Sequence, residues 1–166
     1  MFSKQFSKVR CVSLLKQHDD HEREGWLHRS FSSLLKGRVK SIEFDLHREC
    51  RSGNYTPLLE MVNSLDVTIS PRQTVIWRTN CKDSVDRTGL LQAALFERVF
   101  VMQLQQSNLK ETQEMVDAGR AMMAACNNML SLQYTGTLAV REEVLYSQQT
   151  SRLGLAKVCL CVFSHV

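Results

Sequence analysis

The stretch from Thr74 to Gln92 constrains the fold of this chain more than any other. It reads TVIW-RTN-CKDSVDRTG-LLQ: a β-branched and aromatic run, a polar turn, and a helical pattern that starts near Arg87. A strand that delivers Cys81 to such a turn aims successive backbone N–H groups, those of residues 82 to 87, at one point beside the sulfur. The helix N-terminus adds positive partial charge. We therefore predict a cradle for an oxyanion the size of phosphate.

Each side chain of this turn has a chemical use. A helix N-terminus and a nearby arginine lower a thiol pKa from ~8.5 to ~3.5–7.5, which gives Cys81 the thiolate needed to attack phosphorus. Arg87 presents a planar fork to two phosphoryl oxygens. Thr88 can donate a hydrogen bond to the sulfur when it leaves. We predict a two-step hydrolysis through a phosphocysteine, with no metal and no cofactor.

An alcohol is a poor leaving group, so an acid must protonate it. Asp83 and Asp86 are the carboxylates within reach, and Asp45 ends an earlier predicted strand. We favour Asp86, which directly precedes Arg87, with Asp83 as the alternative. A third interpretation is that Asp86 braces the loop by accepting backbone N–H bonds. A water then hydrolyses the intermediate, with the acid now acting as base.

Strand and helix patterns alternate along the rest of the chain. This alternation predicts an α/β layered fold with a central, largely parallel sheet flanked by helices. The expected strands are Arg10–Leu15, Val39–Phe44 and Thr74–Trp77, and the expected helices are Glu22–Lys36, Leu58–Leu65, one from near Arg87, and about Glu111–Leu132.

Three of these helices carry apolar side chains at helical spacing, which predicts that these side chains turn inward. In the helix that starts near Arg87 they are Leu91, Ala94, Leu95, Val99 and Met102. In the first helix they are Trp26, Leu27, Phe31, Leu34 and Leu35. In the last helix they are Met115, Met122, Ala125 and Met129.

Composition limits the class of protein. A length of 166 residues with 43% apolar side chains suits one domain with a real core. The net charge of +4 tolerates an anionic substrate or membrane surface, and no block of like charge indicates a nucleic-acid arm. The six cysteines lack zinc-ligand spacing and are expected to be reduced thiols in the cytosol. No run reaches the ~18–20 apolar residues of a membrane span, so we expect no transmembrane segment.

The loop from Arg78 to Thr88 closely resembles the signature of the Sac-domain phosphoinositide phosphatases, Arg-x-Asn-Cys-x-Asp-Cys-Leu-Asp-Arg-Thr-Asn. Two positions depart from it: Ser84 replaces the second cysteine and Gly89 replaces the final asparagine. Other segments resemble the family in the same order along the chain. They are Glu43–Cys50 (EFDLHREC), Gln92, Gln133–Thr137 (QYTGT) and Arg152–Leu155 (RLGL).

The resemblance assigns residues 1–155 to a partial Sac-type catalytic domain and leaves 156–166 as an unassigned tail. It implies a cysteine-phosphatase-like fold that is incomplete here, because family members carry a β-rich domain before this region and many carry further helices after it. It also implies removal of a monophosphate from the inositol ring, as in phosphatidylinositol 4-phosphate or 3-phosphate. The expected location is the cytosolic face of the endoplasmic reticulum, Golgi or endosome, in peripheral contact with anionic membrane.

The expected substrate-binding residues surround the nucleophile; they are Asn80, Lys82, Ser84, Val85, Asp45 and His47. Lys82 meets a second phosphate or lipid headgroup, or is simply solvated. Asp45 and His47 line the active site, as the resemblance implies, or cap the strand and hold the loop after it. We interpret three further cations as scattered solvent-facing charges rather than a basic rim for lipid; they are Lys40, Arg48 and Arg51.

Two other functions compete with this one. A protein tyrosine or dual-specificity phosphatase is disfavoured, because two carboxylates in the loop suit an alcohol that needs protonation. A truncated, catalytically inactive Sac-like fragment would act only in lipid or partner binding. The intact loop residues favour the enzyme; they are Cys81, Asp83, Asp86, Arg87 and Thr88.

Overall fold

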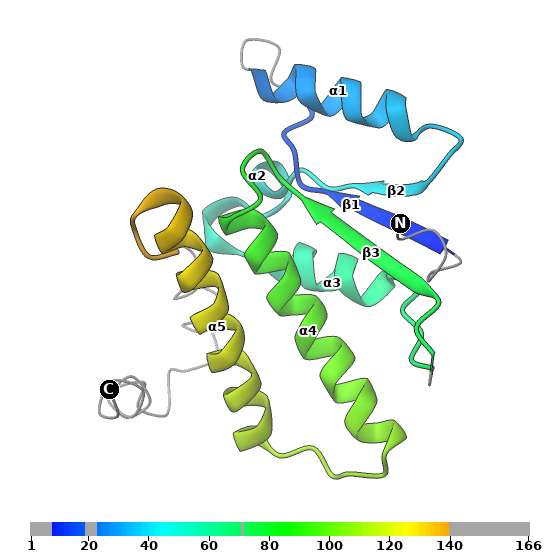
Figure 1. Cartoon of the computed structure of the whole chain (residues 1–166), viewed down its shortest axis with the longest axis vertical. Helices are drawn as coiled ribbons and strands as arrows, with labels where there is room; N and C mark the ends of the chain where they lie inside the picture. The colour runs from blue at the N-terminus through cyan, green and yellow to red at the C-terminus, as the bar shows by residue number, and fades with distance from the viewer. Residues whose placement is uncertain (1–7, 19–22, 71, 140–166) are drawn as a thin grey trace.

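The computed structural model describes residues 8–18, 23–70 and 72–139. At its centre is a three-stranded parallel sheet of order β2-β1-β3, built from β1 (Lys8–Ser13), β2 (Lys40–Glu43) and β3 (Val75–Asn80) (Figure 1). Because the strands run the same way, their carboxyl ends meet at one edge, where α/β folds bind ligands. The predicted α/β fold with a parallel sheet is confirmed.

Helices cover both faces of this sheet (Figure 1). α1 (Arg23–Leu35) lies on one face, and α3 (Thr56–Ser64) and α4 (Asp86–Gln106) lie on the other. α5 (Gln113–Thr135) runs alongside α4 as an outer layer. After β2 come a short helix α2 (Leu46–Glu49) and a 3₁₀ turn η2 (Arg51–Gly53). None of the helices in the described ranges is long and apolar enough to cross a membrane.

The apolar core lies between the sheet and the pair α3 and α4. Leu58 of α3 and Leu91 of α4 are fully buried there, against Val12 of the central strand. Truncating such a leucine to alanine costs about 2–5 kcal/mol. Arg98 ties the two helices together, because its Nη1 donates to the backbone oxygens of Val62 and Leu65 where α3 ends.

The apolar side chains predicted to turn inward from α1 are in part exposed. Trp26 and Leu34 are each 65% exposed, whereas Glu24 and His28 are buried. α1 meets the sheet through polar and charged groups: His28 lies 3.5 Å from the Glu43 carboxylate. The Arg78 guanidinium of β3 lies over the ring of Phe31 at 5.6 Å. The prediction was wrong for Trp26 and Leu34: α1 contacts the sheet through His28 and Phe31, and these two apolar side chains are left exposed among the described residues.

The inward face predicted for α5 is also wrong. Met122 and Met129 are 53% and 62% exposed. α5 instead packs on α4 through a stripe of small and polar residues, Val116, Gly119, Asn127 and Ser131. A side chain at Gly119 would meet Phe96 of α4 at 2.9 Å, so the close approach of the two helices selects glycine there.

Element boundaries differ from the predicted ones in two useful places. β3 continues through Arg78 to Asn80, so the strand runs up to the nucleophile itself. The helix after the loop begins at Asp86, one residue before the predicted start. Pro57 lies in the first turn of α3, where its missing N–H costs no helix hydrogen bond. Arg152–Leu155 and the tail 156–166 lie outside the described residues.

Candidate active site

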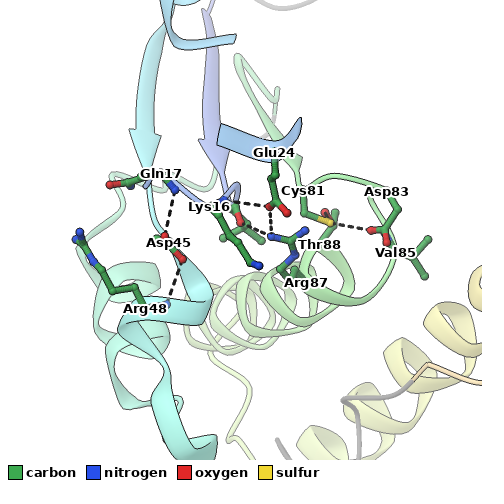
Figure 2. A network of polar contacts seen from close by, with 11 residues as sticks. Lys16, Gln17, Glu24, Asp45, Arg48, Cys81, Asp83, Val85, Arg87 and Thr88 are labelled. Atoms are coloured by element: carbon green, nitrogen blue, oxygen red, sulfur yellow. Dashed lines mark hydrogen bonds and ion pairs between the residues drawn. The ribbon is translucent and has the colours of Figure 1, made fainter. Parts of the chain in front are cut away.

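Cys81 directly follows the last residue of β3 and is buried, with 4% of its surface exposed. Its thiol donates to Asp83 Oδ1 at 3.1 Å and accepts a hydrogen bond from Thr88 Oγ1 at 3.2 Å (Figure 2). Thr88 lies in the first turn of α4. The sulfur is thus held between the end of a strand and the start of a helix, with a hydroxyl donor beside it.

The loop between Cys81 and α4 makes a tight turn. Ser84 adopts a left-handed backbone with φ of 59°, a conformation that side chains other than glycine rarely take. Val85 is the N-cap of α4 and gives no side-chain capping bond. The first N–H groups of a helix have no acceptor within that helix. The start of α4 therefore offers backbone donors and positive partial charge to an anion bound beside Cys81.

The two loop carboxylates have different surroundings. Asp83 Oδ1 accepts from the Cys81 thiol and, at 3.2 Å, from the backbone N–H of Val85. Burial opposes ionisation of Asp83, but these hydrogen bonds outweigh it and hold its pKa below the usual range. Asp86 Oδ1 is buried, and among the described residues no hydrogen-bond partner is found for it. The residue that braces this loop is thus Asp83.

Arg87 is held from behind by a buried acid. Its Nη1 donates to Glu24 Oε1 and, at 3.1 Å, to the backbone oxygen of Leu14 (Figure 2). Glu24 also accepts from the backbone N–H of Lys16 at 3.0 Å. Within the described part of the chain, no partner is found for Nε or Nη2 of Arg87. Among the described residues, the edge of the guanidinium that could bind a phosphoryl group in a bidentate manner is thus not engaged.

The ion pair sets the charge of both partners. Burial opposes the ionisation of Glu24, but the hydrogen bonds from Arg87 and Lys16 hold its pKa below the usual range. Burial likewise opposes the charge on Arg87, while Glu24 raises the pKa of that guanidinium. Both groups are therefore charged at neutral pH. The sequence did not reveal this partner, because an acid in the first turn of a helix is expected anyway as a complement to the helix dipole.

The other predicted substrate-binding residues lie in several places. Lys82 and Ser84 are exposed on the loop, beside the half-buried Val85. The buried Asn80 faces the neighbouring strand, where its Oδ1 accepts from the Cys11 thiol at 3.6 Å. Among the described residues, no group of three or more metal-ligating side chains is arranged to hold a metal ion.

Asp45 does not join the cluster at Cys81. Its carboxylate caps α2 by accepting from the N–H of Arg48 at 3.1 Å, and it accepts from the N–H of Gln17 at 3.1 Å. In Figure 2 it lies on the far side of Lys16 from the sulfur. Asp45 therefore holds the segment after β2, which is the capping alternative for this residue. His47 is exposed and lines a separate cavity.

Gly89 and Gln92 anchor the first turns of α4. A side chain at Gly89 would lie 2.9 Å from the Asn127 amide of α5, so the space left by the glycine is taken by Asn127. Gln92 Nε2 donates to Thr79 Oγ1 at 3.1 Å and links α4 to β3. Asn127 was not recognised from the sequence, because nothing in its local pattern marks it as a neighbour of the loop.

No protein-family model matches this chain. Curated proteins do match it: phosphoinositide phosphatase SAC8 of Arabidopsis thaliana is 25% identical over 169 residues, which is 87% of this chain and 28% of that protein. Phosphatidylinositol-3-phosphatase SAC1 is 25% identical over 162 residues in Drosophila melanogaster (81% of this chain, 27% of that protein). The Saccharomyces cerevisiae protein of that name is 22% identical over 172 residues (86% and 27%).

The chain therefore spans less than three tenths of the length of these relatives. The resemblance predicted from the loop is confirmed: the chain is similar, over most of its length, to part of the Sac phosphoinositide phosphatases.

Proposed function

We propose that this chain carries the catalytic loop of a phosphoinositide phosphatase and hydrolyses a phosphate monoester on the inositol ring through a phosphocysteine. One observation carries the proposal. The buried Cys81 sulfur accepts a hydrogen bond from Thr88 in the first turn of α4, next to an Arg87 that Glu24 holds from behind. Nucleophile, anion donors and a leaving-group stabiliser thus converge at one strand end.

The reaction starts from the Cys81 thiolate, which forms when the thiol gives its proton to solvent water. The thiolate attacks phosphorus, the bond from phosphorus to the ring oxygen breaks, and Asp86 gives its proton to that oxygen. Arg87 and the first amides of α4 stabilise the charge on the transferring phosphoryl group. A water then attacks the phosphocysteine while Asp86 takes up its proton, and the sulfur leaves with a hydrogen bond from Thr88.

The contacts of the loop support Asp86 as the acid. Asp83 is engaged by the Cys81 thiol and the Val85 amide, and its lowered pKa keeps it ionised at neutral pH. Asp86 precedes Arg87, and its buried oxygen has no partner among the described residues.

The relatives are named as phosphoinositide and phosphatidylinositol-3-phosphatases, which supports a phosphoinositide substrate for this chain. We propose phosphatidylinositol 3-phosphate or 4-phosphate, met at the cytosolic face of endomembranes. The net charge of +4 is compatible with peripheral contact with anionic lipid.

A second candidate is a catalytically inactive fragment that only binds lipid or partners. It is favoured by the small share of the relatives' length that this chain covers. The separating experiment measures phosphate release from a panel of phosphoinositides in the presence of EDTA. It compares this chain, its Cys81→Ser variant and a version extended at both ends to the length of the relatives. Phosphate release that requires Cys81 supports the enzyme. If neither this chain nor the extended version releases phosphate with Cys81 intact, the binding fragment is the remaining candidate.

A further inference from the structure

A cavity lies at the same edge of the sheet as the loop after Cys81. Its volume is about 350 Å³, and it is lined by Lys16, His18, Asp45, His47, Arg48 and Arg51. The residues come from the segments after β1 and after β2. Three of the six carry a full positive charge and two are histidines, so one carboxylate is the only negative group in the lining.

That carboxylate is already committed to the backbone. The oxygens of Asp45 accept from the N–H groups of Gln17 and Arg48, so the carboxylate holds the cavity wall and offsets only one of the three positive charges in the lining. Arg48 is shared: its Nε and Nη2 meet Glu49 at 2.8 and 2.7 Å, while its Nη1 lies 3.0 Å from His18 Nε2. Arg51 is exposed on η2. The cavity therefore keeps a net positive lining.

The cavity and the anion cradle are neighbours because of the sheet order. In the order β2-β1-β3, β3 ends at the cradle, and β1 and β2 end at the cavity. Adjacent strands lie about 4.8 Å apart, so the strand ends are one to two such spacings apart, roughly 5–10 Å. Lys16 bridges the two sites: its backbone N–H binds Glu24, the partner of Arg87, and its side chain lies between Asp45 and Arg87 (Figure 2).

We propose that this cavity is a second anion subsite, which binds a phosphate group other than the one that Cys81 attacks. Arginine forks and a lysine suit phosphate oxygens, and the spacing suits two phosphates separated by a polyol ring. The second phosphate belongs to the same substrate molecule or to a lipid headgroup beside it. The inference rests on the proposed function for the position of the first phosphate, and it replaces the interpretation of Arg48 and Arg51 as scattered surface charges.

The test compares Arg51→Gln with Lys110→Gln. Both remove one exposed positive charge, but Lys110 lies beyond the far end of α4, about 30 Å of helix away from the cradle. The quantity is kcat/KM for a soluble inositol bisphosphate divided by kcat/KM for p-nitrophenyl phosphate, which has a single phosphate. We expect Arg51→Gln and Arg48→Gln to lower this ratio at least tenfold and Lys110→Gln to leave it unchanged. An unchanged ratio in all three variants, together with a rate on vesicles that also does not depend on Arg51, overturns the subsite.

A binding arm separates this inference from the proposed function. In the Cys81→Ser background, calorimetry with the soluble bisphosphate should show a Kd at least fivefold higher with Arg51→Gln. Such a result without turnover in the parent would retain the subsite and reject the phosphatase. Turnover in the parent, with neither this Kd nor the rate on vesicles depending on Arg51, would reject the subsite and retain the phosphatase.

A vesicle arm distinguishes the two sources of the second phosphate. Vesicles carry a phosphatidylinositol monophosphate with and without phosphatidylserine. If the rate depends on Arg51 only when phosphatidylserine is present, the subsite takes a neighbouring headgroup. If Arg51 matters for the soluble bisphosphate, the subsite takes a phosphate of the same molecule.

Discussion

The carboxylate of Glu24 and the guanidinium of Arg87 form an ion pair in which both side chains are nearly inaccessible to solvent. The pair joins the first turn of α1 to the first turn of α4, across the carboxyl end of the central strand. Losing one partner of a buried pair leaves a lone charge, which costs about 3–5 kcal/mol. Stability and the placement of the Arg87 guanidinium therefore depend on one contact.

Glu24→Gln should keep the shape of this contact and remove its charge. Without the anchor on Nη1, the Arg87 fork is less well fixed, and we expect kcat/KM for a phosphate monoester to fall about 10–100-fold, with a lower melting temperature. Glu60→Gln on the exposed side of α3 is the matched control and should behave like the parent. A Glu24→Gln variant with parental kcat/KM would mean that Arg87 is positioned by other groups.

The same pair predicts how stability depends on pH. The pKa of Glu24 in the folded chain lies below its ordinary value of 4.5, so the unfolded state binds the proton more readily. The stabilising contribution is present above pH 4.5 and is lost as pH falls through the folded pKa. Urea unfolding at pH 7 and at pH 3 to 4.5 should show a steeper acid loss in the parent than in Glu24→Gln. Parallel curves would contradict the contribution of this carboxylate.

Local sequence patterns predicted the longer elements of this fold well, because each strand or helix has a recognisable residue pattern over a short stretch of sequence. The alternation of strands and helices along the chain was also enough to predict a parallel sheet. The patterns failed where burial depends on a distant surface. Trp26 and Met129 have helical spacing, yet the faces that they occupy meet no apolar partner in the described chain.

The candidate site divides in the same way. The positions of Cys81 and Thr88 follow from a strand, a turn and a helix that are adjacent in sequence, so their contact could be predicted from the local sequence. Glu24 and Asn127 reach the loop from elements 63 and 38 residues away from their contacts at Arg87 and Gly89, respectively, and no local pattern encodes such a meeting. The capping role of Asp45 also required the backbone of Gln17 to be in place.

The nucleophile provides the next prediction. Cys81→Ser replaces only the sulfur, so the hydrogen bond from Thr88 and the cradle should persist while turnover is abolished. Rapid acid quench of the parent with a radiolabelled phosphoinositide should trap phosphate on Cys81, and the label should be absent from the variant. Cys126→Ser, which changes an exposed thiol on α5, is the control. Undiminished hydrolysis by Cys81→Ser would rule out the phosphocysteine.

The packing of Gly89 on Asn127 predicts that Gly89→Ala has opposite effects on the free energy of unfolding in the parent and in the Asn127→Ala variant. Alanine gains up to ~1 kcal/mol over glycine in a helix. In the parent, however, the new Cβ would lie 2.9 Å from Cγ and Oδ1 of Asn127, and overpacking costs about 1–3 kcal/mol. Gly89→Ala should therefore lower the free energy of unfolding in the parent and raise it in the Asn127→Ala background. Denaturant unfolding of the four proteins measures the coupling, and equal effects in both backgrounds would show that the two positions do not compete for space.

The last prediction distinguishes the roles of Asp83 and Asp86 by comparing a substrate whose leaving group needs a proton with one whose leaving group does not. If Asp86 protonates the leaving oxygen, Asp86→Asn should slow hydrolysis of a phosphoinositide about 10²–10⁴-fold, the usual contribution of a general acid. The same variant should spare p-nitrophenyl phosphate, whose leaving group needs no proton. Asp83→Asn should instead slow both substrates alike and lower stability, because Asp83 braces the loop through the Val85 amide and contacts the Cys81 thiol. The reverse pattern, with Asp83→Asn selective and Asp86→Asn affecting both, would make Asp83 the acid and Asp86 the structural residue.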